Sequence, residues 1–197
     1  MRLWNGWGNE DSDLTMELSD GLRALLEALV GSGTALSQAT LNEVIAKVPN
    51  TRLDDHPLIK TDPETRVRHA RGQSLPDWLE MHSGNVDTFP DGVAFPESSE
   101  QVRELLAHAK ENNLIVIPYG GGTSVVGHIN PETSDKPVLT IDMAKMNSML
   151  SIDTESQLAT FGAGAPGPVV EEELKKYGYT LGHFPQSWEL STLGGWV

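Results

Sequence analysis

The chain carries the stretch Val116-Ile117-Pro118-Tyr119-Gly120-Gly121-Gly122-Thr123-Ser124-Val125. In this stretch an apolar run typical of a buried strand reaches a proline and continues into three glycines and two hydroxyl residues. Each glycine forgoes side-chain burial and costs conformational entropy when it is ordered, so we expect no packing requirement for three in a row. Such a loop is useful where main-chain amides must approach a ligand closely. The stretch therefore predicts a strand that leads into a ligand-binding loop.

The composition limits the kinds of protein that this chain can be. Its 197 residues suffice for one sizeable domain with an N-terminal extension. It has no cysteine, which excludes a disulfide framework, a thiolate metal site and a cysteine nucleophile. The six histidines show no metal-ligand spacing, so we expect no metal site. The N-terminus lacks a signal-peptide core, and no apolar run approaches the roughly 18 residues of a membrane span. We expect a soluble, cytoplasmic protein.

The net charge of -14 argues against nucleic acid or an anionic membrane surface as a partner, because both need a concentrated basic face. The charges also bear on the glycine loop. No Lys or Arg lies between Lys110 and Lys136, and none follows Lys176. If the loop binds a phosphate group, we therefore expect neutral main-chain N–H groups to bind it rather than a cationic side chain.

The first 90 residues are predicted to be a helical and extended region. Leucines with the spacing of one helix face predict a short helix that stops near Gly31, and a capping box at Thr40–Glu43 predicts a second helix that ends at Pro49. Leu75–Met81 predicts one or two further helical turns. The segment Asn50–Gly72 is polar and without clear periodicity, so we interpret it as an extended arm. We expect its arginines (Arg66, Arg68 and Arg71) to pair with carboxylates of the chain itself.

From Gly92 onward, the pattern changes to alternating strands and helices. Predicted strands lie at Val93–Phe95, Leu114–Ile117, Val138–Ile141, Met149–Ile152 and Leu158–Phe161. One predicted helix starts after Ser98 and has the apolar face Val102, Leu105, Leu106 and Ala109. Another has Val170, Leu174 and Tyr177 inward and Gly178 at its C′ position. The fold class is therefore α+β, with a domain boundary near Asp91 that separates residues 1–90 from residues 91–197.

Three phosphate-loop interpretations compete. An ATP-type P-loop needs Gly-Lys-Ser/Thr, which the chain does not contain. Gly162-x-Gly164-x-x-Gly167 matches the dinucleotide fingerprint, with Glu189 at the distance of a ribose-binding acid, but only 30 residues follow Gly167, too few for the remaining units of a dinucleotide domain. The third interpretation combines this loop, the glycine triplet and the tail 183–195 around one elongated ligand.

These residues also support a resemblance to a known family. The motifs are Pro118-x-Gly120-Gly121-Gly122-Thr123-Ser124-Val125, the ending Gly182-His183-x-Pro185-x-Ser187-x-Glu189-x-Ser191-Thr192-x-Gly194-Gly195-Trp196-Val197 and the start Trp4-Asn5-Gly6-Trp7-Gly8. Together they closely resemble the alkyldihydroxyacetonephosphate synthases, which belong to the vanillyl-alcohol-oxidase-type (PCMH-type) FAD-binding family. The resemblance extends over nearly the whole chain.

The resemblance implies an FAD-binding PCMH-type domain at residues 91–197. It also implies two cofactor-binding loops, made of Pro118, Tyr119, Gly120, Gly121, Gly122, Thr123 and Ser124 and of Gln186, Ser187, Trp188, Glu189, Leu190, Ser191 and Thr192. Gln186 departs from the pattern, which usually has Asp there, and a neutral amide can still bind through hydrogen bonds. Relatives with covalent flavin often have His directly after the glycine pair, where this chain has Thr123. We therefore expect non-covalent FAD.

The catalytic residues of that family lie in sequence beyond Val197, so we expect no catalytic residue here and interpret the chain as the N-terminal portion of a larger flavoenzyme, truncated at its C-terminal side. The implied substrate is a small molecule bound by an absent cap domain, and a homodimer is an option. Two chemistries fit the intact protein: alkyl-for-acyl exchange on a dihydroxyacetone-phosphate ester, or oxidation of a 2-hydroxy acid or alcohol by hydride transfer to flavin. A flavin-binding fragment without turnover is the alternative from another class.

Overall fold

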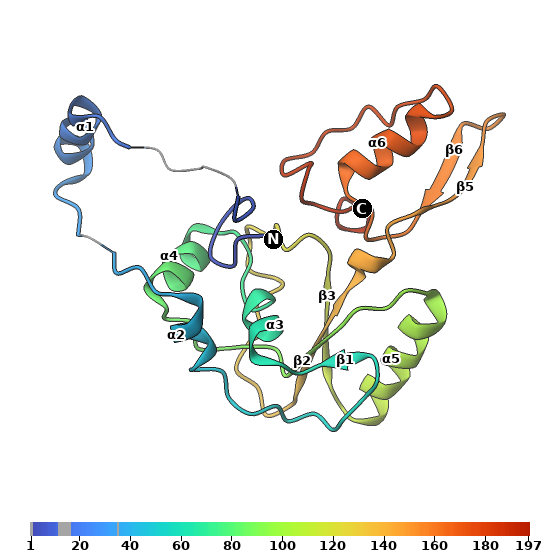
Figure 1. Cartoon of the computed structure of the whole chain (residues 1–197), viewed down its shortest axis with the longest axis horizontal. Helices are drawn as coiled ribbons and strands as arrows, with labels where there is room; N and C mark the ends of the chain where they lie inside the picture. The colour runs from blue at the N-terminus through green and yellow to red at the C-terminus, as the bar shows by residue number, and fades with distance from the viewer. Residues whose placement is uncertain (1, 12–16, 35) are drawn as a thin grey trace.

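The computed structural model describes residues 2–11, 17–34 and 36–197. It contains a four-stranded sheet, a separate two-stranded hairpin and helices packed on both (Figure 1). The α+β class expected from the sequence is confirmed. The strands are β1 (Ile59–Lys60), β2 (Gly92–Ala94), β3 (Ile115–Tyr119), β4 (Val138–Asp142), β5 (Met149–Asp153) and β6 (Leu158–Phe161). The α-helices are α1 (Asp20–Val30), α2 (Leu41–Ile45), α3 (Pro63–Arg68), α4 (Leu75–Ser83), α5 (Ser99–Glu111) and α6 (Gly167–Lys175).

The four-stranded sheet has the order β1-β2-β4-β3. Strands β2, β4 and β3 are parallel, and β1 pairs antiparallel with β2 at the edge. Every residue of β4 is buried, as expected for a near-continuous apolar strand inside a parallel sheet. Tyr119 at the end of β3 is opposite Asp142 at the end of β4, so the carboxyl ends of these strands meet at one edge of the sheet.

Helix α5 connects β2 to β3 and covers one face of the sheet. The Ser98 side chain accepts a hydrogen bond from the main-chain N–H of Gln101 at 3.3 Å, which confirms the predicted cap. Leu105 packs into a core cluster with Leu139 and Ile141 of β4. Val102 and Leu106, which we expected on the same buried face, are only partly buried and exposed, respectively, because the helix turns them toward the carboxyl ends of the strands.

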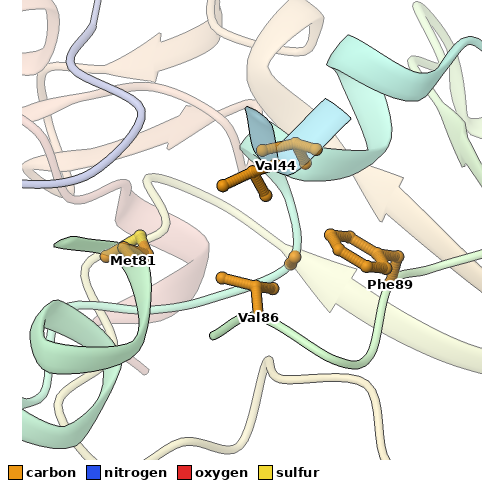
Figure 2. Close-up of a cluster of buried hydrophobic side chains, with 6 residues drawn as sticks. Val44, Met81, Val86 and Phe89 are labelled. Atoms are coloured by element: carbon orange, nitrogen blue, oxygen red, sulfur yellow. The ribbon is translucent and has the colours of Figure 1, made fainter. Parts of the chain in front are cut away.

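Helices α2, α3 and α4 surround a second core cluster, in which Val44, Met81, Val86 and Phe89 converge (Figure 2). The capping box predicted for α2 is present: the main-chain N–H of Glu43 donates to the Thr40 hydroxyl, and the Glu43 carboxylate accepts from the main-chain N–H of Thr40. The helix, which we predicted to end at Pro49, is shorter, since α2 ends at Ile45.

The interpretation of Asn50–Gly72 as an extended arm was wrong. This segment contains α3, capped by the Asp62 side chain, and strand β1, which joins the sheet. It is polar because its side chains bond to distant parts of the chain. Buried Arg66 donates to the main-chain carbonyls of Pro90 and Pro49 at 2.6 and 2.7 Å, whereas we expected a carboxylate partner.

The other two arginines of this segment pair with carboxylates, as expected. Arg68 lies 2.9 Å from Glu64, and Arg71 lies 2.5 Å from Glu80. The predicted domain boundary near Asp91 stays a prediction, and β1 and β2, which pair with each other, lie on opposite sides of it.

Helix α1 stands away from the remaining helices and from both sheets (Figure 1). Its bounds agree with the prediction of a helix that stops near Gly31, and none of its residues is buried. No helix in the described part of the chain is long and apolar enough to cross a membrane.

The antiparallel hairpin β5–β6 and helix α6 form the C-terminal part of the molecule. Val170 and Leu174 of α6 are buried against this hairpin, as predicted. Tyr177 is half exposed rather than inward, because it lies past the last turn of the helix. Gly178 has a φ of 79° and donates to the Lys175 carbonyl while Tyr179 donates to that of Leu174, the expected glycine C′ motif.

Candidate functional site

A cavity of about 830 Å³ lies at the carboxyl ends of the parallel strands. Ligands of open α/β sheets bind in this position, and the volume is typical of small-molecule and cofactor sites, about 300–1,000 Å³. Its lining combines the glycine loop after β3, one side of α5, the end of β4 and the C-terminal tail. The glycine-loop and tail residues that line it include Pro118, Tyr119, Gly120, Gly121, Gly122, Thr123, Ser124, Ser191 and Thr192.

Tight packing requires all three glycines, contrary to our expectation from the sequence. A Cβ atom on Gly120 would overlap the Thr192 hydroxyl, and one on Gly121 would overlap the Leu190 carbonyl oxygen. Gly122 has a φ of 66°, a conformation that L side chains rarely adopt, and a Cβ there would overlap the Tyr119 hydroxyl. The tail therefore lies directly against the glycine loop and forms a wall of the same cavity.

The main-chain N–H groups of the glycine loop are free to bind a ligand. Within the residues that the structure describes, no hydrogen bond is donated by the main-chain amides of Gly121, Gly122, Thr123 or Ser124. Gly121 and Gly122 are buried, and buried main-chain donors are nearly always paired in folded proteins. Four successive unpaired donors beside a cavity are an arrangement suited to an anion.

The Thr192 hydroxyl adds a further polar group without a partner. Thr192 is 6% exposed and lines the cavity, and its Oγ1 accepts and donates no hydrogen bond within the described residues. Thr140 of β4 has the same kind of unpaired hydroxyl but lies outside the cavity lining. An unpaired buried hydroxyl costs free energy, so a ligand that bonds to Thr192 would recover it.

Only part of the second predicted loop, Gln186–Thr192, lines the cavity. Ser191 and Thr192 reach the cavity, whereas the other five residues do not line it. Gln186 and Glu189 are exposed, and Ser187 has a φ of 63° and accepts hydrogen bonds from the amides of Leu190 and Ser191. The remaining two face other segments, since Leu190 packs on Gly121 and the Trp188 ring lies where a Cβ of Gly167 would be.

The glycine fingerprint at residues 162–167 serves chain packing. It follows β6, which belongs to an antiparallel hairpin, so it is not part of a parallel βαβ unit. Cβ atoms on Gly162 and Gly164 would overlap the carbonyl oxygens of Met146 and Met143. The amide of Gly167 already donates to the Trp188 carbonyl at 3.2 Å. The NAD interpretation therefore has no structural support.

Two hydrogen-bonded connections hold the far end of the glycine loop. The Ser124 carbonyl accepts from the amide of Gln73 at 2.6 Å. Asn130 accepts from the amide of Gly72 at 3.0 Å and donates to the Asp77 carboxylate at 2.6 Å. Asp77 also completes the capping box of α4 with Ser74. The start of α4 therefore fixes the loop on the side opposite β3.

A buried polar pair lies below the loop. His69 Nε2 is 3.0 Å from Asp142 Oδ2, and the His69 ring packs against the Tyr119 ring at a centroid distance of 4.6 Å. Burial raises the pKa of Tyr119 to about 12, so this phenol stays protonated at neutral pH. The sequence interpretation did not identify this group, because 73 residues separate His69 from Asp142.

Several other residues that line the cavity were not predicted. These are Val102, Leu106, Val116, Val125, Val126, His128, Ile129, Ile141, Met143 and Val197. Ala163, Gly194 and Gly195 also line the cavity, and they belong to the two loops that the third interpretation places with the glycine triplet around one ligand. The sequence did contain one signal for the part of the cavity formed by α5. The apolar face of this helix is wider than the sheet covers, so Val102 and Leu106 are left to line the cavity. From the sequence we expected neutral main-chain N–H groups, not a cationic side chain, to bind a phosphate at this loop, and this stays a prediction. The structure adds that the Arg2 guanidinium donates a hydrogen bond to the Gly121 carbonyl.

Comparison with known proteins agrees with this geometry. Residues 90–197 match the family model described as FAD binding domain. Over 141 residues, 71% of this chain, it is 39% identical to the alkyldihydroxyacetonephosphate synthase of Trypanosoma brucei brucei, of which it covers 23%. Over 98% of its length it is 32% identical to the synthase of Caenorhabditis elegans, of which it covers 37%.

A solved structure of an alkyldihydroxyacetonephosphate synthase superimposes on 98% of this chain with a TM-score of 0.80 and 30% sequence identity. The chain covers 42% of that structure. It thus spans between about a quarter and two fifths of the length of these proteins.

Proposed function

This chain belongs to the FAD binding domain family and has FAD as its cofactor, and from this premise we propose that it binds the FAD diphosphate at the glycine loop without a covalent bond. The observation that carries the proposal is the row of unpaired amides at Gly121–Ser124 beside the cavity. These donors fit a diphosphate, which offers several acceptor oxygens with negative charge.

We assign the direct cofactor contacts to Pro118–Ser124, Ser191 and Thr192, which share the cavity. Of the remaining members of the second loop, Gln186–Leu190, two support the site by packing: the Leu190 carbonyl abuts Gly121, and Trp188 abuts Gly167. The lack of a histidine after Gly122 is the reason for proposing non-covalent attachment. We also propose that a domain boundary near Asp91 separates residues 1–90 from residues 91–197.

The proposed activity of the whole protein is that of an alkyldihydroxyacetonephosphate synthase, an exchange of an alkoxy group for the acyloxy group of a dihydroxyacetone-phosphate ester. Support comes from the identity of 32–39% to proteins of that name and from the superposition over 98% of the chain. FAD would supply the electrophilic centre, while the residues described here bind and orient it.

The experiment that tests FAD binding is a fluorescence titration of the purified, untagged chain with FAD. We expect saturable binding and release of the flavin into the supernatant after acid precipitation. A chain that takes up no FAD would contradict the proposal, and flavin that stays with the precipitate would contradict non-covalent attachment.

The reaction class is tested separately, on the full product of the gene, with an acyl-dihydroxyacetone-phosphate and a long-chain alcohol. We expect an ether product without consumption of an electron acceptor. Turnover of a 2-hydroxy acid or an alcohol that reduces an added acceptor would instead support the oxidase or dehydrogenase alternative.

A further inference from the structure

Arg2 lies against the glycine loop although 119 residues separate it from Gly121. Its Nη1 donates a hydrogen bond to the Gly121 carbonyl oxygen. Among the described residues, no carboxylate lies within ion-pair distance of this guanidinium. Within the described part of the chain, the positive charge of Arg2 is therefore not neutralised by a neighbouring carboxylate.

The segment that carries Arg2, residues 2–10, is held in place by several contacts. We call it the N-terminal turn. The Arg2 carbonyl accepts a hydrogen bond from Arg68 at 2.9 Å, and the Leu3 amide donates to the Gly8 carbonyl at 3.0 Å. Trp4 packs on the core cluster of α2–α4, and Glu10 lies 3.3 Å from Arg68. Arg2 thus reaches the glycine loop from an anchored main chain.

The Gly121–Gly122 peptide links Arg2 to the cavity. In a planar trans peptide the C=O and the following N–H point in opposite directions. Because the Gly121 carbonyl points to Arg2, which is outside the cavity lining, the N–H of Gly122 points away from Arg2, and Gly122 lines the cavity. A hydrogen bond to a carbonyl also polarises its peptide and strengthens the N–H as a donor.

We propose that Arg2 is a positioning residue for the diphosphate of the cofactor, which orients the Gly121–Gly122 peptide and supplies the positive charge that the glycine loop itself lacks. The assignment rests on the proposed FAD site and adds a residue from the opposite end of the chain to it. The group that is bound is a diphosphate dianion. Arg2 acts on it indirectly, by orienting the Gly121–Gly122 peptide and by the electrostatic attraction of its positive charge.

The field of Arg2 reaches the glycine loop. Burial raises the pKa of Tyr119, the residue that precedes the glycines, and the charge of Arg2 acts in the opposite direction to lower it. Inside a protein, charges several ångströms apart interact more strongly than in water. One cation near a diphosphate is therefore expected to contribute measurably to affinity, and this contribution is expected to weaken with added salt.

The test compares FAD affinity for the untagged wild-type chain and three variants at low and high ionic strength. Arg2→Met removes the charge and keeps a side chain of similar bulk, and Arg2→Lys restores the charge. Arg23→Met is the matched control, because it removes the same charge from α1, which has no buried residue. Unfolding midpoints without FAD report any purely structural effect.

At low ionic strength we expect Arg2→Met to bind FAD about tenfold more weakly than the wild type, Arg2→Lys to recover most of the affinity, and Arg23→Met to bind like the wild type. The salt dependence of binding should be smaller for Arg2→Met than for the wild type, a difference that a merely structural role would not produce. Equal affinity and equal salt dependence of Arg2→Met and wild type would overturn this assignment alone. A wild-type chain that binds no FAD would overturn the proposed function with it.

Discussion

His69 and Asp142 are hydrogen-bonded to each other beneath the glycine loop. His69 Nδ1 is 2.8 Å from the Thr65 carbonyl, which only accepts hydrogen bonds, so Nδ1 carries a proton. Nε2 faces the Asp142 carboxyl group at 3.0 Å, and a hydrogen bond there requires a second proton, on either the ring or the carboxyl group. Asp142 also accepts from the amide of Ala144 at 2.8 Å. The pair thus joins α3 to the end of β4.

This proton count predicts that Asp142→Asn is tolerated and Asp142→Leu is not. An asparagine amide can donate to an unprotonated Nε2 while its oxygen accepts from Ala144, so we expect a loss of less than about 1 kcal/mol in unfolding free energy. Leucine leaves both partners unpaired in a buried site, which is expected to cost about 1–3 kcal/mol. Urea denaturation measures both values. Equal losses for the two variants would show that the pair needs a full negative charge.

Thr192→Val tests whether the unpaired hydroxyl of the tail binds the cofactor. Removal of an unpaired buried hydroxyl should leave the stability of the cofactor-free chain unchanged or slightly higher. FAD affinity should fall roughly two- to tenfold, the value of one hydrogen bond. Thr140→Val is the matched control, since its hydroxyl is also buried and unpaired but lies outside the cavity lining. Equal affinities of the two variants in a fluorescence titration would argue against a Thr192 contact.

Gly121→Ala is expected to disturb both the glycine loop and its cofactor. The added methyl group would overlap the Leu190 carbonyl, so the tail must move, at a cost of about 2 kcal/mol in unfolding free energy. FAD affinity should fall because the row of amides shifts with the loop. Gly33→Ala serves as the control, as no atom lies within 4 Å of the position of its Cβ. If Gly121→Ala kept wild-type FAD affinity, this loop would not be the binding site.

Asp91 should contribute a pH-dependent part of the stability. Burial acts to raise the pKa of Asp91, but hydrogen bonds from Arg52 and from the Val138 amide outweigh burial and hold the pKa below its usual range. Since the folded pKa lies below the unfolded value of about 3.9, the stabilisation is fully present above that pH and is lost as the pH falls through the folded pKa.

We therefore expect Asp91→Asn to lower the unfolding free energy by about 2 kcal/mol at neutral pH and to flatten its decline in acid. Exposed Asp54 provides the control, because Asp54→Asn removes a carboxylate without these partners. Denaturation at a series of pH values measures the effect. A decline in acid that is as steep for Asp91→Asn as for the wild type would contradict the role of Asp91.

Much of the local structure followed from the sequence because local rules govern it. The apolar run before the glycines formed β3, and side chains such as Ser98 and Thr40 capped the helices that they precede. The glycine loop was predicted from its composition to bind a ligand. The steric requirement for glycine at these positions was not predicted, because the overlap of a Cβ atom with Leu190 or Thr192 depends on where the tail lies in space.

The polar segment Asn50–Gly72 shows why the remainder could not be predicted. Its hydrophilic composition indicated an exposed arm, yet Arg66 and Arg71 are buried, because each finds carbonyl or carboxylate partners on other segments. A buried charge is tolerated only when such partners are present. Sequence periodicity contains no information about partners that are many residues away.

The sequence by itself determined most of the helices and strands outside Asn50–Gly72 and the position of the glycine loop, because helix caps, apolar periodicity and glycine conformations depend on neighbouring residues. Only the tertiary structure decided which groups meet around the glycine loop. Arg2 reaches Gly121 across 119 residues, and His69 reaches Asp142 across 73. The physical reason is that hydrogen bonds and charge interactions depend on distance in space, which is set when the strands pair and the N-terminal turn packs against α3 and the glycine loop.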